Sequence, residues 1–207
     1  LRLEALQAVL EQNNHTVYQA DTIADACAVV RDHIIPEINP QSISWGGSMT
    51  FFASGLYDVL KTSTDVEVID TFDKSASAQE THERRRRALL VDLFLTGTNA
   101  VTETGLLVNL DMIGNRVAAL TFGPKQVLIF IGRNKIVPDL EAAVARIKNF
   151  AAPVNVIRLD KKNPCRKTGR CENCNSPDRS CNTWTITEKS FPKHRVKVVL
   201  INEDMGF

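Results

Sequence analysis

Residues 42–50 read Ser42-Ile43-Ser44-Trp45-Gly46-Gly47-Ser48-Met49-Thr50. The first four residues predict a short strand, and the two glycines that follow predict a turn. Ser48 can then cap a helix that reaches about Leu60, and a second strand is expected at 66–69. A strand, a glycine turn, a helix and another strand in this order are typical of an α/β protein.

Strands and helices alternate on both sides of this unit. Upstream, we expect a helix over 1–12, a strand at 17–19, and a helix from 22 that ends at Pro36. Downstream, helices are expected at 78–90 and from Pro138. The remaining expected strands are 93–96, 106–109, 117–121, 127–131, 154–159, 183–187 and 196–201. The pattern predicts an α/β fold with a mostly parallel sheet, helices on both faces, a small mixed-strand part, and a ligand crevice at the carboxyl ends of the strands.

Composition limits the possible partners. The chain has 207 residues, of which 43% are apolar, which suits one domain over residues 1–207. A net charge of +1 argues against a general affinity for nucleic acid or membrane surfaces. The longest apolar run, 127–131, is too short to span a bilayer, and the N-terminal residues show no signal-peptide pattern. We therefore expect a cytoplasmic protein with no nucleic-acid partner and no membrane span.

The sharpest chemical signal is a cysteine-rich loop at 160–182. Four of the five cysteines follow the spacing C-x5-C-x2-C-x6-C, as Cys165, Cys171, Cys174 and Cys181. The central pair projects two sulfurs from one tight turn, and the outer two can complete the four thiolate ligands that zinc or an iron–sulfur cluster requires. Basic side chains in the same loop can balance the negative charge. An unmetallated, reduced loop is the alternative, and Cys27 is expected to be a small buried hydrophobe.

Two segments are candidates for small-molecule binding. Gly46, Gly47 and Ser48 lie where a strand passes into a helix, so backbone N–H groups there could hold an anion, although an ordinary capped turn needs the same residues. The polar segment 96–105 follows the next strand and is longer than a turn needs. Its hydrogen-bonding side chains include Thr98 and Asn99, which could orient a ligand. In the same segment Glu103 could act as base, nucleophile or acceptor.

Basic residues offer further candidates. Asn115 and Arg116 follow a glycine, and the guanidinium could clamp a carboxylate or phosphate through two hydrogen bonds. Lys125 and Lys135 are expected to be surface charges. The run 84–87, four consecutive arginines, is either a solvated helix face or a phosphate or nucleic-acid patch.

Several of these motifs together resemble the lactate-utilization (LUD) domain family, in its single-domain branch with a C-terminal four-cysteine motif. The matching segments are Trp45-Gly46-Gly47-Ser48-Met49-Thr50, residues 96–105, Gly114-Asn115-Arg116-Val117-Ala118-Ala119, residues 132–141, the cysteine segment 164–182, and residues 201–207. The resemblance implies a fold like the NagB, ribose-phosphate isomerase and CoA-transferase group. It also implies lactate utilization beside iron–sulfur proteins. A 4Fe-4S cluster is therefore favoured over zinc, and an iron–sulfur or oxidoreductase protein is an expected partner.

Three functions agree with these features. The first is an accessory or redox subunit that binds a small anionic metabolite and carries an iron–sulfur or zinc centre. The second is a stand-alone enzyme of CoA-transferase or ligase type that uses Glu103, a comparison that the family resemblance suggests. The third is a non-catalytic binding module with structural zinc.

Overall fold

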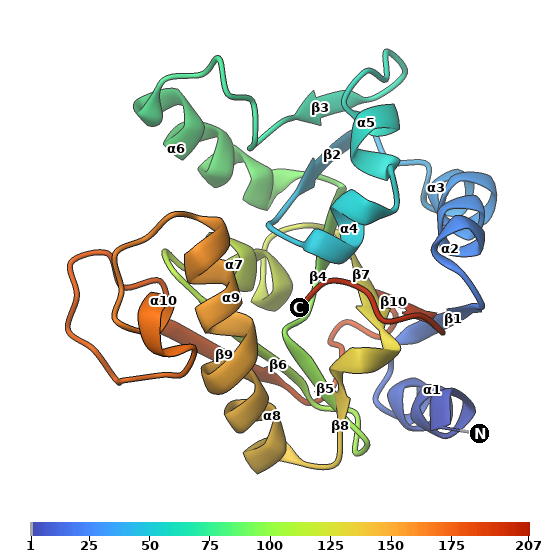
Figure 1. Cartoon of the computed structure of the whole chain (residues 1–207). Helices are drawn as coiled ribbons and strands as arrows, with labels where there is room; N and C mark the ends of the chain where they lie inside the picture. Colours follow the sequence, from blue (N-terminus) through green and yellow to red (C-terminus); the bar gives the residue numbers. More distant parts are fainter. Residues whose placement is uncertain (1) are drawn as a thin grey trace.

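The computed structural model describes residues 2–207, so Leu1, where the first predicted helix begins, lies outside the described residues. A six-stranded sheet forms its centre, and every neighbouring pair of strands in it is parallel (Figure 1). In spatial order the strands are β1 (Thr16–Ala20), β10 (Val196–Ile201), β7 (Gln126–Gly132), β4 (Leu93–Gly97), β2 (Ser42–Trp45) and β3 (Glu67–Ile69). In the register of the sheet, Ile129 of β7 lies between Val198 and Thr96. The predicted mostly parallel sheet is confirmed.

A second, four-stranded sheet forms the mixed part. Its order is β8 (Ile136–Val137), β5 (Ala100–Thr102), β6 (Leu107–Asp111) and β9 (Thr183–Thr187). β6 is antiparallel to both β5 and β9, whereas β8 pairs with β5 in parallel. Because β4 runs almost directly into β5, and β8 follows β7 closely, the small sheet lies beyond the carboxyl ends of the central strands.

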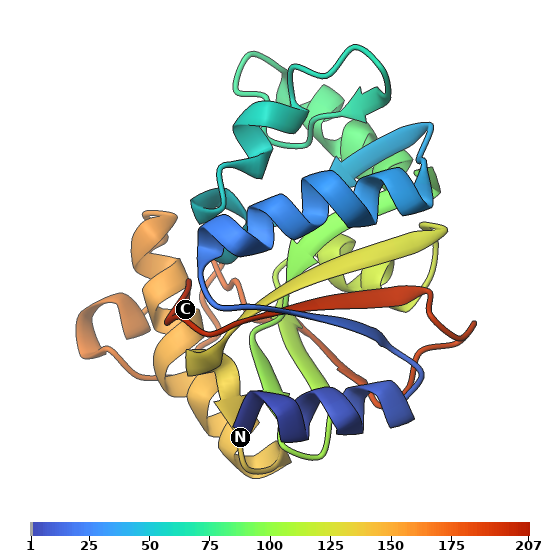
Figure 2. The same ribbon diagram turned by 90° about the vertical axis from the view of Figure 1, so that its right-hand side faces the viewer.

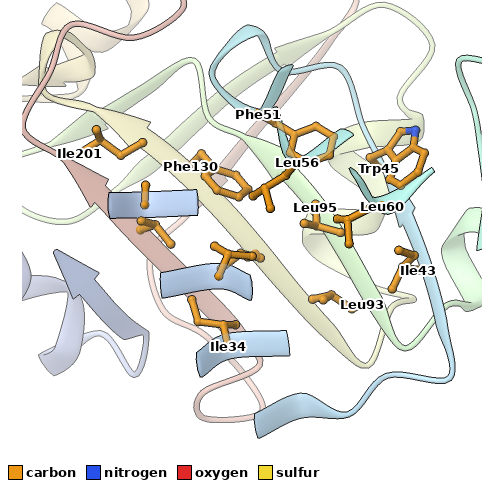
Figure 3. Packing of buried hydrophobic residues seen from close by; sticks show 14 of the residues in the cluster. Ile34, Ile43, Trp45, Phe51, Leu56, Leu60, Leu93, Leu95, Phe130 and Ile201 are labelled. Atoms are coloured by element: carbon orange, nitrogen blue, oxygen red, sulfur yellow. The ribbon is translucent and has the colours of Figure 1, made fainter. Parts of the chain in front are cut away.

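Helices cover both faces of the central sheet because its strands are apolar on both sides. Leu128 and Phe130 of β7 join one cluster, while Val127, Ile129 and Ile131 join another, as the two-residue period of a strand requires. Figure 3 shows the first cluster, which the helices after β1 and β2 complete. Figure 2 shows α1 and the α2–α3 helix on opposite sides of the sheet.

The helices on the first face are α2 (Ile23–Val29), η1 (Val30–Ile34), α3 (Ile35–Ile38), α4 (Met49–Ala53) and α5 (Leu56–Leu60). On the second face lie α1 (Arg2–Gln12) and α7 (Asn115–Thr121). The others are α6 (Ala78–Arg87), η2 (Ala88–Leu90), η3 (Arg133–Lys135), α8 (Leu140–Arg146), η4 (Ile147–Ala151), α9 (Ala152–Arg158) and α10 (Cys165–Thr168). Within residues 2–207 no helix is long and apolar enough to cross a bilayer.

Two of the predicted strands are wrong. Residues 117–121 lie in α7, and residues 154–159 fall almost entirely in α9. In α9 the buried residues are Pro153 and Val156, and in α7 Val117 and Leu120 are buried, which is a spacing of three in both helices. A run of five or six mostly apolar residues does not distinguish this pattern from a buried strand.

The helix that was predicted to end at Pro36 continues to Ile38. Its middle is the π-helical turn η1, directly before the turn that contains the proline. The wider hydrogen-bond register of a π turn lets the helix pass a residue that has no N–H. Asn39, in the left-handed conformation at φ 46°, then ends it. The same arrangement recurs at Pro153, where the π-helical turn η4 joins α8 to α9.

His15 makes the stability of this fold sensitive to acid. The side chain is 1% exposed. Burial lowers the pKa of the imidazole from 6.5 to about 4, and neither ring nitrogen has a hydrogen-bond partner among the described residues. Because the unfolded chain binds this proton more readily, the free energy of unfolding should fall by about 3 kcal/mol as the pH drops from 6.5 to 4.

Urea denaturation at a series of pH values measures this loss. His15→Leu should flatten the profile between pH 6.5 and 4, since leucine has no proton to bind. A variant as sensitive to acid as the original chain would contradict the assignment to His15.

Candidate functional site

A cavity of about 420 Å³ lies at the carboxyl ends of the central strands. Gly47 and Ser48 after β2, Thr71 after β3, Gly97 at the end of β4 and Lys135 after β7 form part of its wall. The opposite wall comes from η4, α9 and the residues after β6. This is the edge of the sheet at which the crevice was expected, and the cavity has the size of a small-molecule site.

The glycine turn is a capped turn that also shapes the cavity. Ser48 caps α4, because its Oγ accepts a hydrogen bond from the backbone N–H of Phe51 at 3.1 Å. α4 has only five residues, too few for a substantial helix dipole. Gly46 lies behind the turn, where a Cβ would stand 2.8 Å from Cγ of Arg116. Glycine is therefore needed at 46 for close packing, while Gly47 and Ser48 border the cavity.

Thr98 and Asn99 also border the cavity, and most of their polar atoms are occupied. The hydroxyl of Thr98 donates to backbone carbonyls at Ala100 and Val108. Oδ1 of Asn99 accepts from the backbone N–H of Leu110 and from Arg116, at 2.9 Å each. Among the described residues Nδ2 of Asn99 has no acceptor, so it remains available as a donor to a ligand.

Arg116 holds the site together and has no donor to spare. The side chain is 7% exposed. Its guanidinium has five N–H groups, and each meets an acceptor of the protein. These acceptors are Asp111 Oδ1 at 3.4 Å, Gly97 O at 3.0 Å, Asn109 Oδ1 at 2.7 Å, Asn99 Oδ1 at 2.9 Å and Leu110 O at 3.3 Å. To hold a ligand through two hydrogen bonds, as predicted, Arg116 would therefore have to give up hydrogen bonds that join β4 to β6.

The structure separates Glu103 from this cavity. Glu103 follows β5 on an exposed turn, and its Oε1 accepts a hydrogen bond from Nε of Arg2 at 3.0 Å. It does not border the 420 Å³ cavity, whereas Asn115, at the start of α7, does. Of the predicted ligand-binding residues, Gly47, Ser48, Thr98, Asn99, Asn115 and Arg116 border the cavity, and Gly46 and Glu103 do not.

Lys135 lines the cavity, so the prediction that it is a surface charge is wrong. Its side chain is 3% exposed, and Nζ donates to Thr50 Oγ1 at 3.0 Å. Burial, with a smaller effect from Arg146 and then Arg116, lowers the pKa of this amine from 10.5 to about 7. The signal in the sequence was its position directly after the long apolar strand at 127–131, where strand-end residues of a parallel sheet point into the crevice.

The charge around the cavity is positive. Arg85, Arg158 and Lys161 border it together with Arg116 and Lys135, whereas Asp111 is the single acidic side chain among the described residues that line it. Asp111 is already paired with Arg116. The other three arginines of the run 84–87 form ion pairs with Asp73, Glu80, Glu83 and Glu67, so that run is mainly an ion-paired helix surface. Such a cavity favours an anionic ligand.

A second, smaller cavity of about 50 Å³ lies beside the first. Cys165, Cys171, Cys174 and Cys181 all border it. Leu110, Ala152 and Ser180 border both cavities, so these three residues form a shared wall. The cysteine loop thus packs against α9, the helix that also borders the larger cavity.

The thiols differ in how readily they ionise. Hydrogen bonding, first from the backbone N–H of Ser176 and then from Asn163, lowers the pKa of Cys174 below its usual value. Burial, and then the neighbouring thiols, raise the pKa of Cys165, while burial is the largest cause of a raised pKa at Cys181. Because Cys171, Cys174 and Cys181 all raise the pKa of Cys165, the four side chains lie close enough to interact electrostatically.

The small cavity also contains buried polar atoms without partners among the described residues. These are Oδ1 of Asn163 and Oγ of Ser180. Buried polar atoms of native proteins nearly always have a partner, which can be a bound group. Within residues 2–207, however, there is no group of three or more His, Cys, Asp or Glu side chains that could hold a metal ion. The four cysteines therefore share a cavity without forming a closed ligand shell.

These features describe an α/β protein with a parallel central sheet and a positively charged cavity at the strand ends. A family model described as LUD domain matches residues 3–201. The chain belongs to the LUD domain family and is in that sense a lactate-utilization-like protein. Its place in a four-cysteine branch of the family stays a prediction.

Comparison with solved structures gives two likenesses. A DUF162 family protein from Deinococcus radiodurans has a TM-score of 0.54 and 14% identity, over 97% of this chain and 96% of that one. At that identity the likeness shows the fold. A ribose 5-phosphate isomerase from Plasmodium falciparum has a TM-score of 0.30 and 12% identity, over 67% of this chain and 54% of that one. A comparison with curated proteins finds no match.

Proposed function

We propose that this LUD-domain protein is an accessory or redox subunit in lactate utilization. In this proposal the large cavity binds a small anionic metabolite, and the four cysteines bind an iron–sulfur centre. The observation that carries the proposal is the shared wall of Leu110, Ala152 and Ser180, with a positively charged cavity on one side and four thiols on the other. An iron–sulfur centre supplies one-electron transfer when it is bound.

The family resemblance favours a 4Fe-4S cluster over a single zinc ion. The four cysteines border a common cavity, but within residues 2–207 they are not gathered into a ligand shell, so the loop would have to close around either group. The orphaned Asn163 and Ser180 atoms would lie next to such a group.

The enzyme alternative has less support. A CoA-transferase-like mechanism at the large cavity needs Glu103 beside the ligand, and that carboxylate is paired with Arg2 outside the cavity. A binding module with structural zinc differs from the main proposal in its metal. Metal analysis therefore separates these two.

Anion binding is tested by calorimetric titration of the full chain with lactate, pyruvate and sulfate. At least one of these anions should bind and raise the thermal midpoint. Arg158→Met should weaken binding about tenfold, because one hydrogen bond to a charged group, worth about 1.5 kcal/mol, is lost at the rim. The matched control is Arg86→Met, since Arg86 lies 70% exposed on α6. Equal affinity in Arg158→Met and the control would contradict the placement of the anion.

A further inference from the structure

Lys135 differs from every other cation at the cavity in its surroundings. It lies in η3, directly after β7, and borders the cavity although its side chain is almost fully buried. An ammonium group has three N–H donors. Thr50 Oγ1 is the single hydrogen-bond partner that Nζ has among the described residues, and that hydroxyl donates onward to the carbonyl of Met205.

The charged side chains that act on the pKa of the amine are both positive. α7 brings Arg116 and α8 brings Arg146, both of which disfavour a further positive charge. α4 brings the hydroxyl of Thr50, and the C-terminal segment brings the backbone of Gly206, where an added Cβ would lie 3.4 Å from Nζ. Asp111, the one acidic side chain among the described residues that line the cavity, is paired with Arg116. On η3 itself, Arg133 is paired with the exposed Asp204.

A buried ammonium without a counter-charge is costly, so the free amine gives up its proton near neutral pH, with a pKa of about 7. An anion in the cavity would supply both the missing charge and the missing acceptors. It would therefore restore the ammonium form.

We infer that Lys135 contacts the anionic group of the ligand and takes up a proton when that ligand binds. The inference rests on the proposed anion site and adds to it the residue that sets its pH dependence. The ligand class is a small carboxylate or another anion that stays ionised above pH 6. Its binding is strongest where the amine is already protonated.

The test is calorimetric titration of the full chain with lactate, pyruvate and sulfate in buffers of different ionisation enthalpy. Proton uptake should be about one half at pH 7 and close to one at pH 8, as a free pKa of about 7 requires. Affinity should be about tenfold weaker at pH 8 than at pH 6, because the protonated fraction falls by that factor.

Lys135→Met should abolish both the proton uptake and the pH dependence. Lys125→Met is the matched control, because Lys125 lies just before the opposite end of β7, is 77% exposed and is paired with Asp92. Thr50→Val removes the hydrogen-bond acceptor of the amine. Because that acceptor favours the protonated form, its loss should shift the fall in anion affinity to lower pH. The measurement on the unmodified chain holds even where a variant does not fold.

The outcomes separate the two proposals. Anion binding without proton uptake, or with the same uptake in Lys135→Met, overturns the role of Lys135 and leaves the anion site standing. Failure of all three anions to bind overturns both.

Discussion

Replacing Cys174 by serine is expected to remove the metal centre. A serine hydroxyl is a poor substitute for a thiolate, and hydrogen bonds from Ser176 and Asn163, with Arg179 nearby, lower the pKa of Cys174. Protein purified without oxygen should carry iron and sulfide in stoichiometric amounts. The Cys174→Ser variant should carry only a small fraction of that and lose the visible charge-transfer absorption.

The same loss is expected for serine at Cys165, Cys171 and Cys181. Cys27→Ser is the matched control, because Cys27 packs against the apolar cluster on one face of the central sheet, and it should retain full metal content. Trp184 borders the cysteine cavity and provides a fluorescence signal for loading. Metal content that is equal in the control and in the four variants would contradict the assignment. Zinc without sulfide would favour the binding module.

Replacing Arg116 by methionine should lower the free energy of unfolding by about 3–5 kcal/mol. The variant removes one donor from each of four acceptors on β4, on β6 and at Asn99, although the side-chain oxygens of Asn99 and Asn109 each keep one backbone N–H donor. It also leaves the carboxylate of Asp111, whose side chain is 15% exposed, without its ion-pair partner. Urea denaturation followed by circular dichroism measures the change.

Arg86→Met is the control for charge and size. Its ion pair with Glu83 is exposed on α6, and its loss should change stability by less than about 0.5 kcal/mol. A similar, small effect at both positions would show that the guanidinium of Arg116 is not the structural centre of this cavity.

The arrangement of the sheet could be predicted to a large extent from the sequence. β7 and β10 are apolar on both faces, and that composition indicates parallel strands covered by helices. The glycine turn after β2 indicated a crossover from strand to helix, which the structure confirms with Ser48 as the cap. The sequence predicts strands at α7 and α9 because an apolar run this short fits either element.

The cavity was less predictable because it depends on long-range contacts. Arg116 meets Gly97 and Asn99 only after β4 and β6 are in place, so its sequence neighbourhood gave no sign that its donors are used up. Lys135 likewise owes its burial to Thr50 and to the C-terminal segment, which lie 85 and about 70 residues away in the chain. Glu103 looked suitable as a base by residue type, but its turn leads away from the cavity toward Arg2.

The most direct test of a link between the two cavities is the reduction potential of the metal-loaded chain. It is measured at pH 6 with and without a saturating anion. At this pH most Lys135 side chains are already protonated, so the bound anion adds negative charge across the wall of Leu110, Ala152 and Ser180. Negative charge near the centre favours its oxidised form. We predict a lower potential with the anion bound. A potential that the anion leaves unchanged, or a chain that holds no redox-active centre, would contradict the account.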